Sequence, residues 1–122
     1  MFSFNKTIGR RTKENGYREA KIIVNNEFVE GVGGGVCQVS STLYNSALLA
    51  GLEIIEANKH SKQVNYVKYG FDAMVNFGSS DLKFKNDSGA DIYIYAYTGP
   101  KIEKAKLFLS LRTLEREVDG LY

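Results

Sequence analysis

The fold of this chain is decided by a stretch that joins a glycine cluster to the single cysteine: Gly31-Val32-Gly33-Gly34-Gly35-Val36-Cys37-Gln38-Val39-Ser40-Ser41-Thr42-Leu43-Tyr44. Apolar residues recur at helical spacing from Val39 to Ala50, and Gly51 supplies a C-terminal stop. The pattern predicts a helix from Gln38 to Ala50, with Cys37 at or within its first turn.

Cys37 is thereby placed where an activated thiol would sit. The unpaired N–H groups and the positive dipole end of a helix N-terminus favour the thiolate, which is the nucleophilic form. Gly33, Gly34 and Gly35 would leave the space before the sulfur free of side chains, as an extended substrate requires. Position alone leaves two interpretations open, an activated nucleophile and a small buried cysteine packed behind a glycine turn.

Length and composition narrow the class of protein. A chain of 122 residues suits one domain, and 43% hydrophobic with 25% charged residues are ordinary globular values. The net charge of +2, spread along the chain, argues against nucleic acid or an anionic membrane as a partner. No stretch approaches the roughly 20 apolar residues of a membrane span. We expect a soluble chain that carries no secretory signal at its start.

The pattern beyond the helix is rich in short β-runs that alternate apolar with polar residues, as in an antiparallel sheet with one wet face. A hairpin around Asn25-Asn26 is predicted to precede the glycine cluster. Residues 1–19 are polar and are predicted to wrap the core as loop or short helix. The predicted strands after the helix are residues 53–56, 64–67, 73–77, 82–84, 92–97 and 105–111. The prediction is an α+β fold, one central helix with the cysteine at its N-terminus on a mostly antiparallel sheet.

A cysteine nucleophile needs a base, and the base needs an orienting group. The only histidine, His60, follows the first strand after the helix, and Asp72 stands at the head of a later one. The order of Cys37, His60 and Asp72 is that of papain-like and transglutaminase-like thiol enzymes. Two alternatives stay open: His60 as a solvated loop residue, and Asp72 as a turn residue that accepts backbone N–H bonds. Gln38 either supplies a donor to a developing oxyanion or caps the helix.

Other chemistries fit the sequence less well. One cysteine and one histidine fall short of the usual four zinc ligands, and the glycine cluster lacks the patterns of phosphate or dinucleotide loops. We therefore predict neither a metal nor a cofactor. The hydroxyls of Ser40, Ser41 and Thr42 fit helix residues that satisfy backbone groups. Ser40 is also assigned, with the three glycines, to the predicted substrate-binding side.

Several ordered motifs, taken together, resemble the VanW family over about residues 2–97, which leaves residues 98–122 as a C-terminal strand and tail of a single domain. They are Phe2-Ser3-Phe4-Asn5-Lys6-Thr7-Ile8-Gly9, Thr12-Lys13-Glu14-Asn15-Gly16-Tyr17, the Gly31 to Tyr44 stretch, Ala50-Gly51-Leu52-Glu53, His60-Ser61, Asp72-Ala73 and Asp81-Leu82-Lys83-Phe84-Lys85-Asn86. The family is named after an accessory protein of vancomycin resistance clusters in Gram-positive bacteria, and it often occurs beside predicted peptidoglycan-binding modules. The resemblance implies the cell envelope or exterior as location and peptidoglycan or a related peptide as ligand.

Carried over by position, Cys37, Gln38, His60 and Asp72 match polar motif positions of that family. The chain departs from the family pattern at Arg10 and at Lys68-Tyr69, where prolines are usual. Three functions are therefore compared: a thiol acyl-transfer enzyme acting on peptidoglycan stem peptides, a non-catalytic wall-binding module, and a scaffolding domain. A sulfur within reach of the imidazole favours the enzyme, whereas a buried sulfur far from His60 favours binding.

Overall fold

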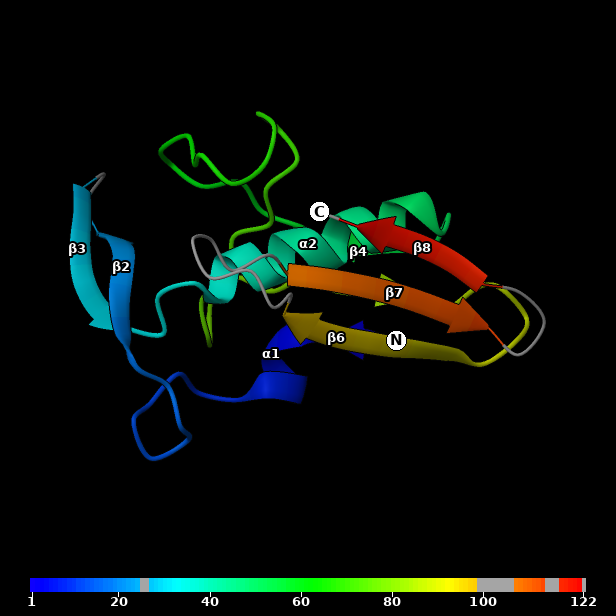
Figure 1. Cartoon of the computed structure of the whole chain (residues 1–122), viewed down its shortest axis with the longest axis horizontal. Helices are drawn as coiled ribbons and strands as arrows, with labels where there is room; N and C mark the ends of the chain where they lie inside the picture. Colours follow the sequence, from blue (N-terminus) through cyan, green and yellow to red (C-terminus); the bar gives the residue numbers. More distant parts are fainter. Residues whose placement is uncertain (25–26, 99–106, 114–116, 122) are drawn as a thin grey trace.

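A computed structural model shows the fold over residues 1–24, 27–98, 107–113 and 117–121. Within these residues the elements are β1 (Phe2–Ser3), α1 (Phe4–Ile8), β2 (Glu19–Val24), β3 (Glu27–Val32), α2 (Val36–Leu49), β4 (Glu53–Glu56), β5 (Lys83–Lys85), β6 (Ile92–Thr98), β7 (Leu107–Thr113) and β8 (Glu117–Leu121). Helix α2 occupies the centre with β6, β7 and β8 beside it, whereas the β2–β3 hairpin stands clear at one end (Figure 1). The predicted α+β class is confirmed.

Helix α2 follows the predicted pattern but begins two residues earlier and ends one residue earlier than the sequence indicates. Gly35 precedes it with φ of 91°, a left-handed conformation that glycine adopts without steric cost. Leu43 and Ala47 turn one face of the helix into the core, where they are 4% and 0% exposed. The prediction of a helix with Cys37 in its first turn is confirmed.

Gly33, in the glycine cluster, packs directly against the side chain of Arg11. A Cβ atom at Gly33 would lie 2.7 Å from Cβ of Arg11, and Gly33 has φ of +92°, so both space and backbone require glycine there. The Arg11 guanidinium donates to the carbonyl of Gly9 at 2.8 Å and to the amide oxygen of Asn5 at 2.6 Å. These contacts hold the turn that leads into α2.

The described strands form three small antiparallel sheets rather than one, with the orders β1-β5-β4, β2-β3 and β6-β7-β8. β1 pairs Phe2 with Phe84, so the N-terminal segment closes an edge of the first sheet. The pairing of β2 with β3 confirms the predicted hairpin, although its turn at residues 25–26 lies outside the described residues. Residues 105–106 of the last predicted strand also lie outside them, and β8 was not predicted.

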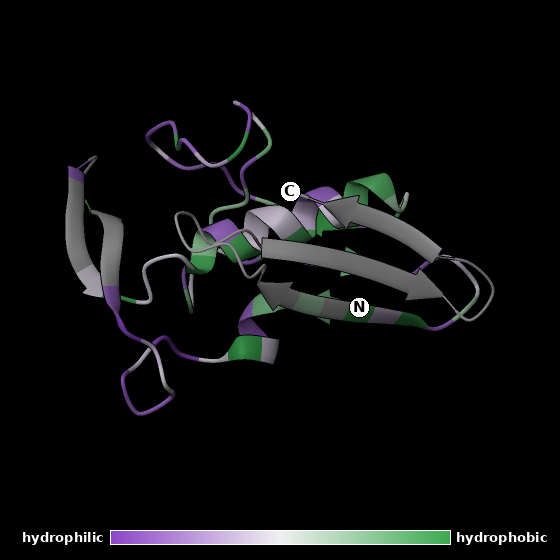
Figure 2. Cartoon of the chain, viewed as in Figure 1, coloured by the Kyte–Doolittle hydropathy of each residue, from purple (hydrophilic) through white to green (hydrophobic). Residues whose placement is uncertain are grey.

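The core lies between α2 and the first sheet. Its buried residues come from the N-terminal segment, from helix α2, from the residues directly after that helix, and from the segments that follow His60. The hydropathy colouring shows the C-terminal end of α2 as hydrophobic and the long irregular segment after β4 as largely hydrophilic (Figure 2). The buried apolar cluster consists of Phe4, Leu43, Ala47, Leu52, Ala73, Val75, Leu82 and Phe84.

Two predicted strands are wrong, because residues 64–67 and 73–77 form no strand of a sheet. The second of these segments lies against α2, where side chains of the helix take the place of a neighbouring strand. The hydroxyl of Ser41 accepts from the N–H of Ala73 at 2.9 Å, and the hydroxyl of Ser40 donates to the carbonyl of Ala73. This irregular segment is thereby fixed beside the first turns of the helix.

Candidate active site

The thiol of Cys37 lies under the segment that follows Asp72. Its Sγ atom is 3.5 Å from both the carbonyl oxygen and the backbone nitrogen of Val75, with the N–H donating to sulfur. Cys37 is a free cysteine of intermediate exposure, neither sealed in the core nor fully open to solvent. These weak contacts with Val75 fix the position of the sulfur and leave it available for reaction.

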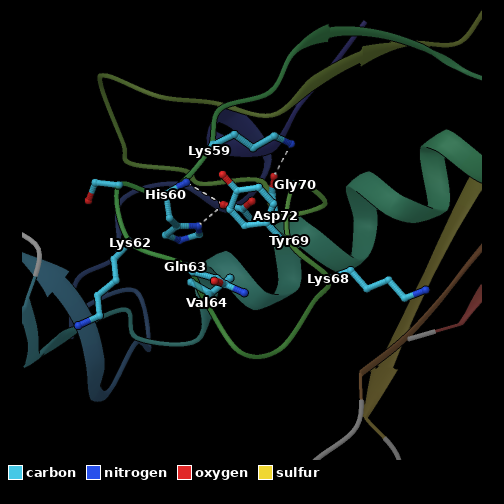
Figure 3. Close-up of a pocket in the computed structure, with 10 residues that line it drawn as sticks. Lys59, His60, Lys62, Gln63, Val64, Lys68, Tyr69, Gly70 and Asp72 are labelled. Carbon is cyan, nitrogen blue, oxygen red and sulfur yellow. Dashed lines mark hydrogen bonds and ion pairs between the residues drawn. The ribbon is translucent and has the colours of Figure 1, made fainter.

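His60 and Asp72 form a close, buried pair (Figure 3). The imidazole Nδ1 lies 2.7 Å from Oδ2 of Asp72, and the same oxygen accepts from the backbone N–H of His60 at 2.7 Å. The two side chains are only 8% and 11% exposed. Because an ionised carboxylate can only accept, Nδ1 carries a proton and Nε2 faces the rest of the site.

The thiol of Cys37 lies close enough to the same imidazole to influence its pKa. Burial favours the neutral ring, but hydrogen bonds and charge from Cys37 and Asp72 outweigh burial and raise the pKa of His60 above 6.5. Burial alone would raise the pKa of Asp72, yet the backbone N–H and ring of His60 lower it below 3.8. The structure thus brings together all three residues that the order of the sequence singled out, although His60 and Asp72 lie in irregular segments rather than on strands.

Helix side chains also fix the backbone on both sides of Asp72. The amide of Asn45 donates to the carbonyl of Phe71 at 2.9 Å, while the hydroxyls of Ser40 and Ser41 hold the residue after Asp72. Ser40 was assigned to the substrate-binding side, but it is 0% exposed and its hydroxyl is engaged inside the protein. In the structure the hydroxyl of Ser40 instead contacts the carbonyl groups of Cys37 and of Ala73, the residue after Asp72.

The first turn of α2 offers one backbone donor to a ligand. The N–H of Gln38 donates to the carbonyl of Gly35 at 3.1 Å, so the proposed oxyanion role of that backbone group does not fit. Within the described part of the chain, the N–H of Cys37 has no acceptor. Of the glycines that precede it, Gly33 and Gly34 are half-buried and Gly35 is exposed.

Two residues of the site were missed by the sequence analysis. The phenol oxygen of Tyr66 lies 3.4 Å from Nε2 of His60, but Tyr66 falls in a run that the alternation indicated as strand. Arg11 lies within electrostatic reach of the thiol: burial lowers its pKa, and negative charge at Tyr17 and Cys37 opposes that shift. No local sequence signal marks either residue, because both act through contacts across the fold.

A pocket of about 340 Å³ borders His60 and Asp72, but Cys37 is not among its lining residues. Its walls carry Lys59, Lys62 and Lys68, and the side chains of the last two point away from the pair in Figure 3. The ammonium group of Lys59 donates to the carbonyl of Asp72 at 3.1 Å. Among the described residues, no three histidine, cysteine, aspartate or glutamate side chains converge as metal ligands would.

The His60–Asp72 pair predicts a pH-dependent contribution to stability. The raised pKa of His60 gives stability that is full below pH 6.5 and is lost as the pH rises through that pKa. The lowered pKa of Asp72 gives stability that is present above pH 3.8 and is lost as the pH falls. We expect Asp72→Asn to lower the free energy of unfolding by about 2 kcal/mol near pH 5.5 and by less near pH 8.5.

Urea unfolding of both proteins at the two pH values measures this difference. Asp91→Asn removes an exposed carboxylate and serves as the control, with an expected change below about 0.5 kcal/mol. An effect of Asp72→Asn that is the same at both pH values would show that Asp72 does not hold a proton on His60.

The fold and the site define an α+β protein with a cysteine in the first turn of its central helix, electrostatically coupled to a buried histidine–aspartate pair. The chain belongs to the VanW family: the family described as VanW like protein matches residues 1–108. The resemblance read from the motifs is therefore confirmed. Neither helix of the described residues has the length and apolar character needed to span a bilayer.

Two relatives support the same placement. "Uncharacterized protein YoaR" of Bacillus subtilis (strain 168) is 50% identical over 95 residues, which cover 78% of this chain and 31% of that protein. "Vancomycin B-type resistance protein VanW" of Enterococcus faecalis (strain ATCC 700802 / V583) is 29% identical over 100 residues, or 77% of this chain and 36% of that protein. The chain spans about a third of the length of these relatives. No solved structure matches it.

Proposed function

We propose that this chain is a cysteine-dependent acyl-transfer enzyme, a peptidase, amidase or transpeptidase acting on peptidoglycan stem peptides. The observation that carries the proposal is one buried imidazole that binds a carboxylate and is influenced by a nearby thiol. Nδ1 of His60 binds Asp72 at 2.7 Å, and the thiol of Cys37 raises the pKa of the same ring. A cysteine with a purely structural role has no need of a buried histidine–aspartate pair beside it.

The residues divide the chemistry between them. Sγ of Cys37 attacks the acyl carbon while its proton passes to Nε2 of His60, and Asp72 stabilises the imidazolium through Nδ1–H. The N–H of Cys37 binds the oxyanion. The imidazolium then protonates the leaving amine, and water or a second amine releases the acyl group from sulfur.

The substrate class rests on the family and on the charge around the site. One relative is named for vancomycin resistance, and the family resemblance implies a wall peptide as ligand. The pocket beside the histidine–aspartate pair is lined by the exposed residues Lys59, Lys62 and Lys68. Although the last two extend away from the pair, positive charge at the pocket wall favours a substrate that carries carboxylates. A peptide with free carboxyl groups meets both requirements.

Incubation with purified peptidoglycan stem peptides, followed by intact-mass measurement, tests the proposal. We expect a thioester adduct on Cys37 together with release of the amine portion, and neither event with Cys37→Ala. The opposite result is equally clear. If the peptides bind wild type and Cys37→Ala with equal affinity and neither adduct nor cleavage product forms, the chain is a binding module.

A further inference from the structure

Tyr66 lies beside Nε2 of His60, the ring nitrogen that does not contact Asp72. Its phenol oxygen is 3.4 Å from Nε2 of His60, and its ring meets the imidazole edge-on at 82°, with centroids 6.3 Å apart. Asp72 occupies the opposite ring nitrogen at 2.7 Å. Tyr66 therefore stands on the side from which the nucleophile is deprotonated.

The tautomer of His60 decides which way this hydrogen bond runs. Asp72 accepts from Nδ1–H, so Nε2 of the neutral ring has only a lone pair to offer. The phenol O–H must then be the donor to Nε2. Since the thiol of Cys37 must deliver its proton to that same lone pair, Tyr66 and Cys37 compete for it in the resting protein.

The surroundings of the phenol keep it protonated. Burial raises the pKa of Tyr66, and the charge of Cys37 raises it further, whereas the side chain of Ser41 acts the other way. Ser41 lies four residues after Cys37, one helical turn along the same face, and its hydroxyl donates to the Cys37 carbonyl at 2.7 Å. The phenol is thus a neutral donor next to the nucleophile.

We infer that Tyr66 is a further catalytic residue, a side-chain donor to the oxyanion that forms when Cys37 attacks an acyl group. This inference rests on the function proposed above. When the proton of the thiol moves to Nε2, the lone pair that held the phenol O–H is consumed. The carbonyl π electrons move to oxygen as the S–C bond forms, and the released O–H donates to that oxygen beside the N–H of Cys37.

Two reactions of the same thiol separate this role from a structural one. Acylation of Cys37 by p-nitrophenyl acetate forms a tetrahedral oxyanion and releases p-nitrophenolate, whereas alkylation by iodoacetamide forms no oxyanion. We expect Tyr66→Phe to slow the p-nitrophenolate burst by about 100-fold, the usual effect of losing one oxyanion donor. Alkylation should stay within about threefold of wild type, because the base and the thiol are untouched.

Tyr93→Phe is the matched control, since Tyr93 lies on β6, is 49% exposed and does not line the pocket beside His60 and Asp72, and it should change neither rate. An equal loss of both rates in Tyr66→Phe would show that Tyr66 only supports His60. Unchanged rates would show that Tyr66 takes no part in the reaction. Either result overturns the inference and leaves the proposed function standing. A wild-type protein with no burst dependent on Cys37 overturns the proposed function and this inference with it.

Discussion

His60→Gln is expected to slow alkylation of Cys37 by iodoacetamide about tenfold or more at pH 7. The thiolate is the reactive form, and a thiol without a basic partner is only a few per cent thiolate at that pH. In the structure burial lowers the pKa of the imidazole, but Cys37 and Asp72 together raise it above its ordinary value. The loss should shrink as the pH rises through about 8.5, where an unassisted thiol ionises by itself.

The measurement is simple because the chain has a single cysteine, so the mass of the alkylated protein reports one site. Lys68→Gln is the control: it removes a positive charge from the same pocket wall without touching the pair, and we expect it to change the rate less than twofold. If His60→Gln reacts at the wild-type rate, the imidazole does not activate the thiol and the proposed enzyme is ruled out.

Asp81→Ala is expected to lower the free energy of unfolding by about 3 kcal/mol, the largest stability effect predicted for a single polar residue here. The Asp81 carboxylate is buried and accepts from the backbone N–H groups of Asn5 and Leu82, each at 2.8 Å, and from the hydroxyl of Ser3 at 2.5 Å. The Asp81 carboxylate therefore links the N-terminal segment to β5, the strand that follows Asp81. Alanine leaves the two N–H groups buried without an acceptor, at about 1–3 kcal/mol each.

Urea denaturation at neutral pH measures this loss, and Asp81→Asn provides the comparison. The asparagine side chain keeps one oxygen for the two N–H groups and an NH₂ group that can donate to the hydroxyl of Ser3. We expect it to recover at least half of the lost stability. A variant Asp81→Ala that unfolds within about 0.5 kcal/mol of wild type would contradict the role of this carboxylate in holding the N-terminal segment.

Local patterns in the sequence predicted the elements whose structure depends on neighbours along the chain. The helical spacing from Val39 to Ala50 and the glycines on either side identified α2, because periodic burial and a left-handed Gly35 are local requirements. The hairpin of β2 and β3 and the strand β4 were predicted in the same way. The types and order of Cys37, His60 and Asp72 also pointed to thiol chemistry.

Only the tertiary structure brings Cys37, His60 and Asp72 together. Residues 73–77 alternate like a strand, yet helix side chains replace a partner strand: the hydroxyls of Ser40 and Ser41 bind the backbone of Ala73, and Sγ of Cys37 contacts that of Val75. An alternating pattern reports only that one face is buried, and it does not say whether strand or helix covers it. This packing places Asp72 beside His60 and near the thiol. The fold also places Tyr66 beside Nε2 of His60, a contact that no spacing in the sequence specifies.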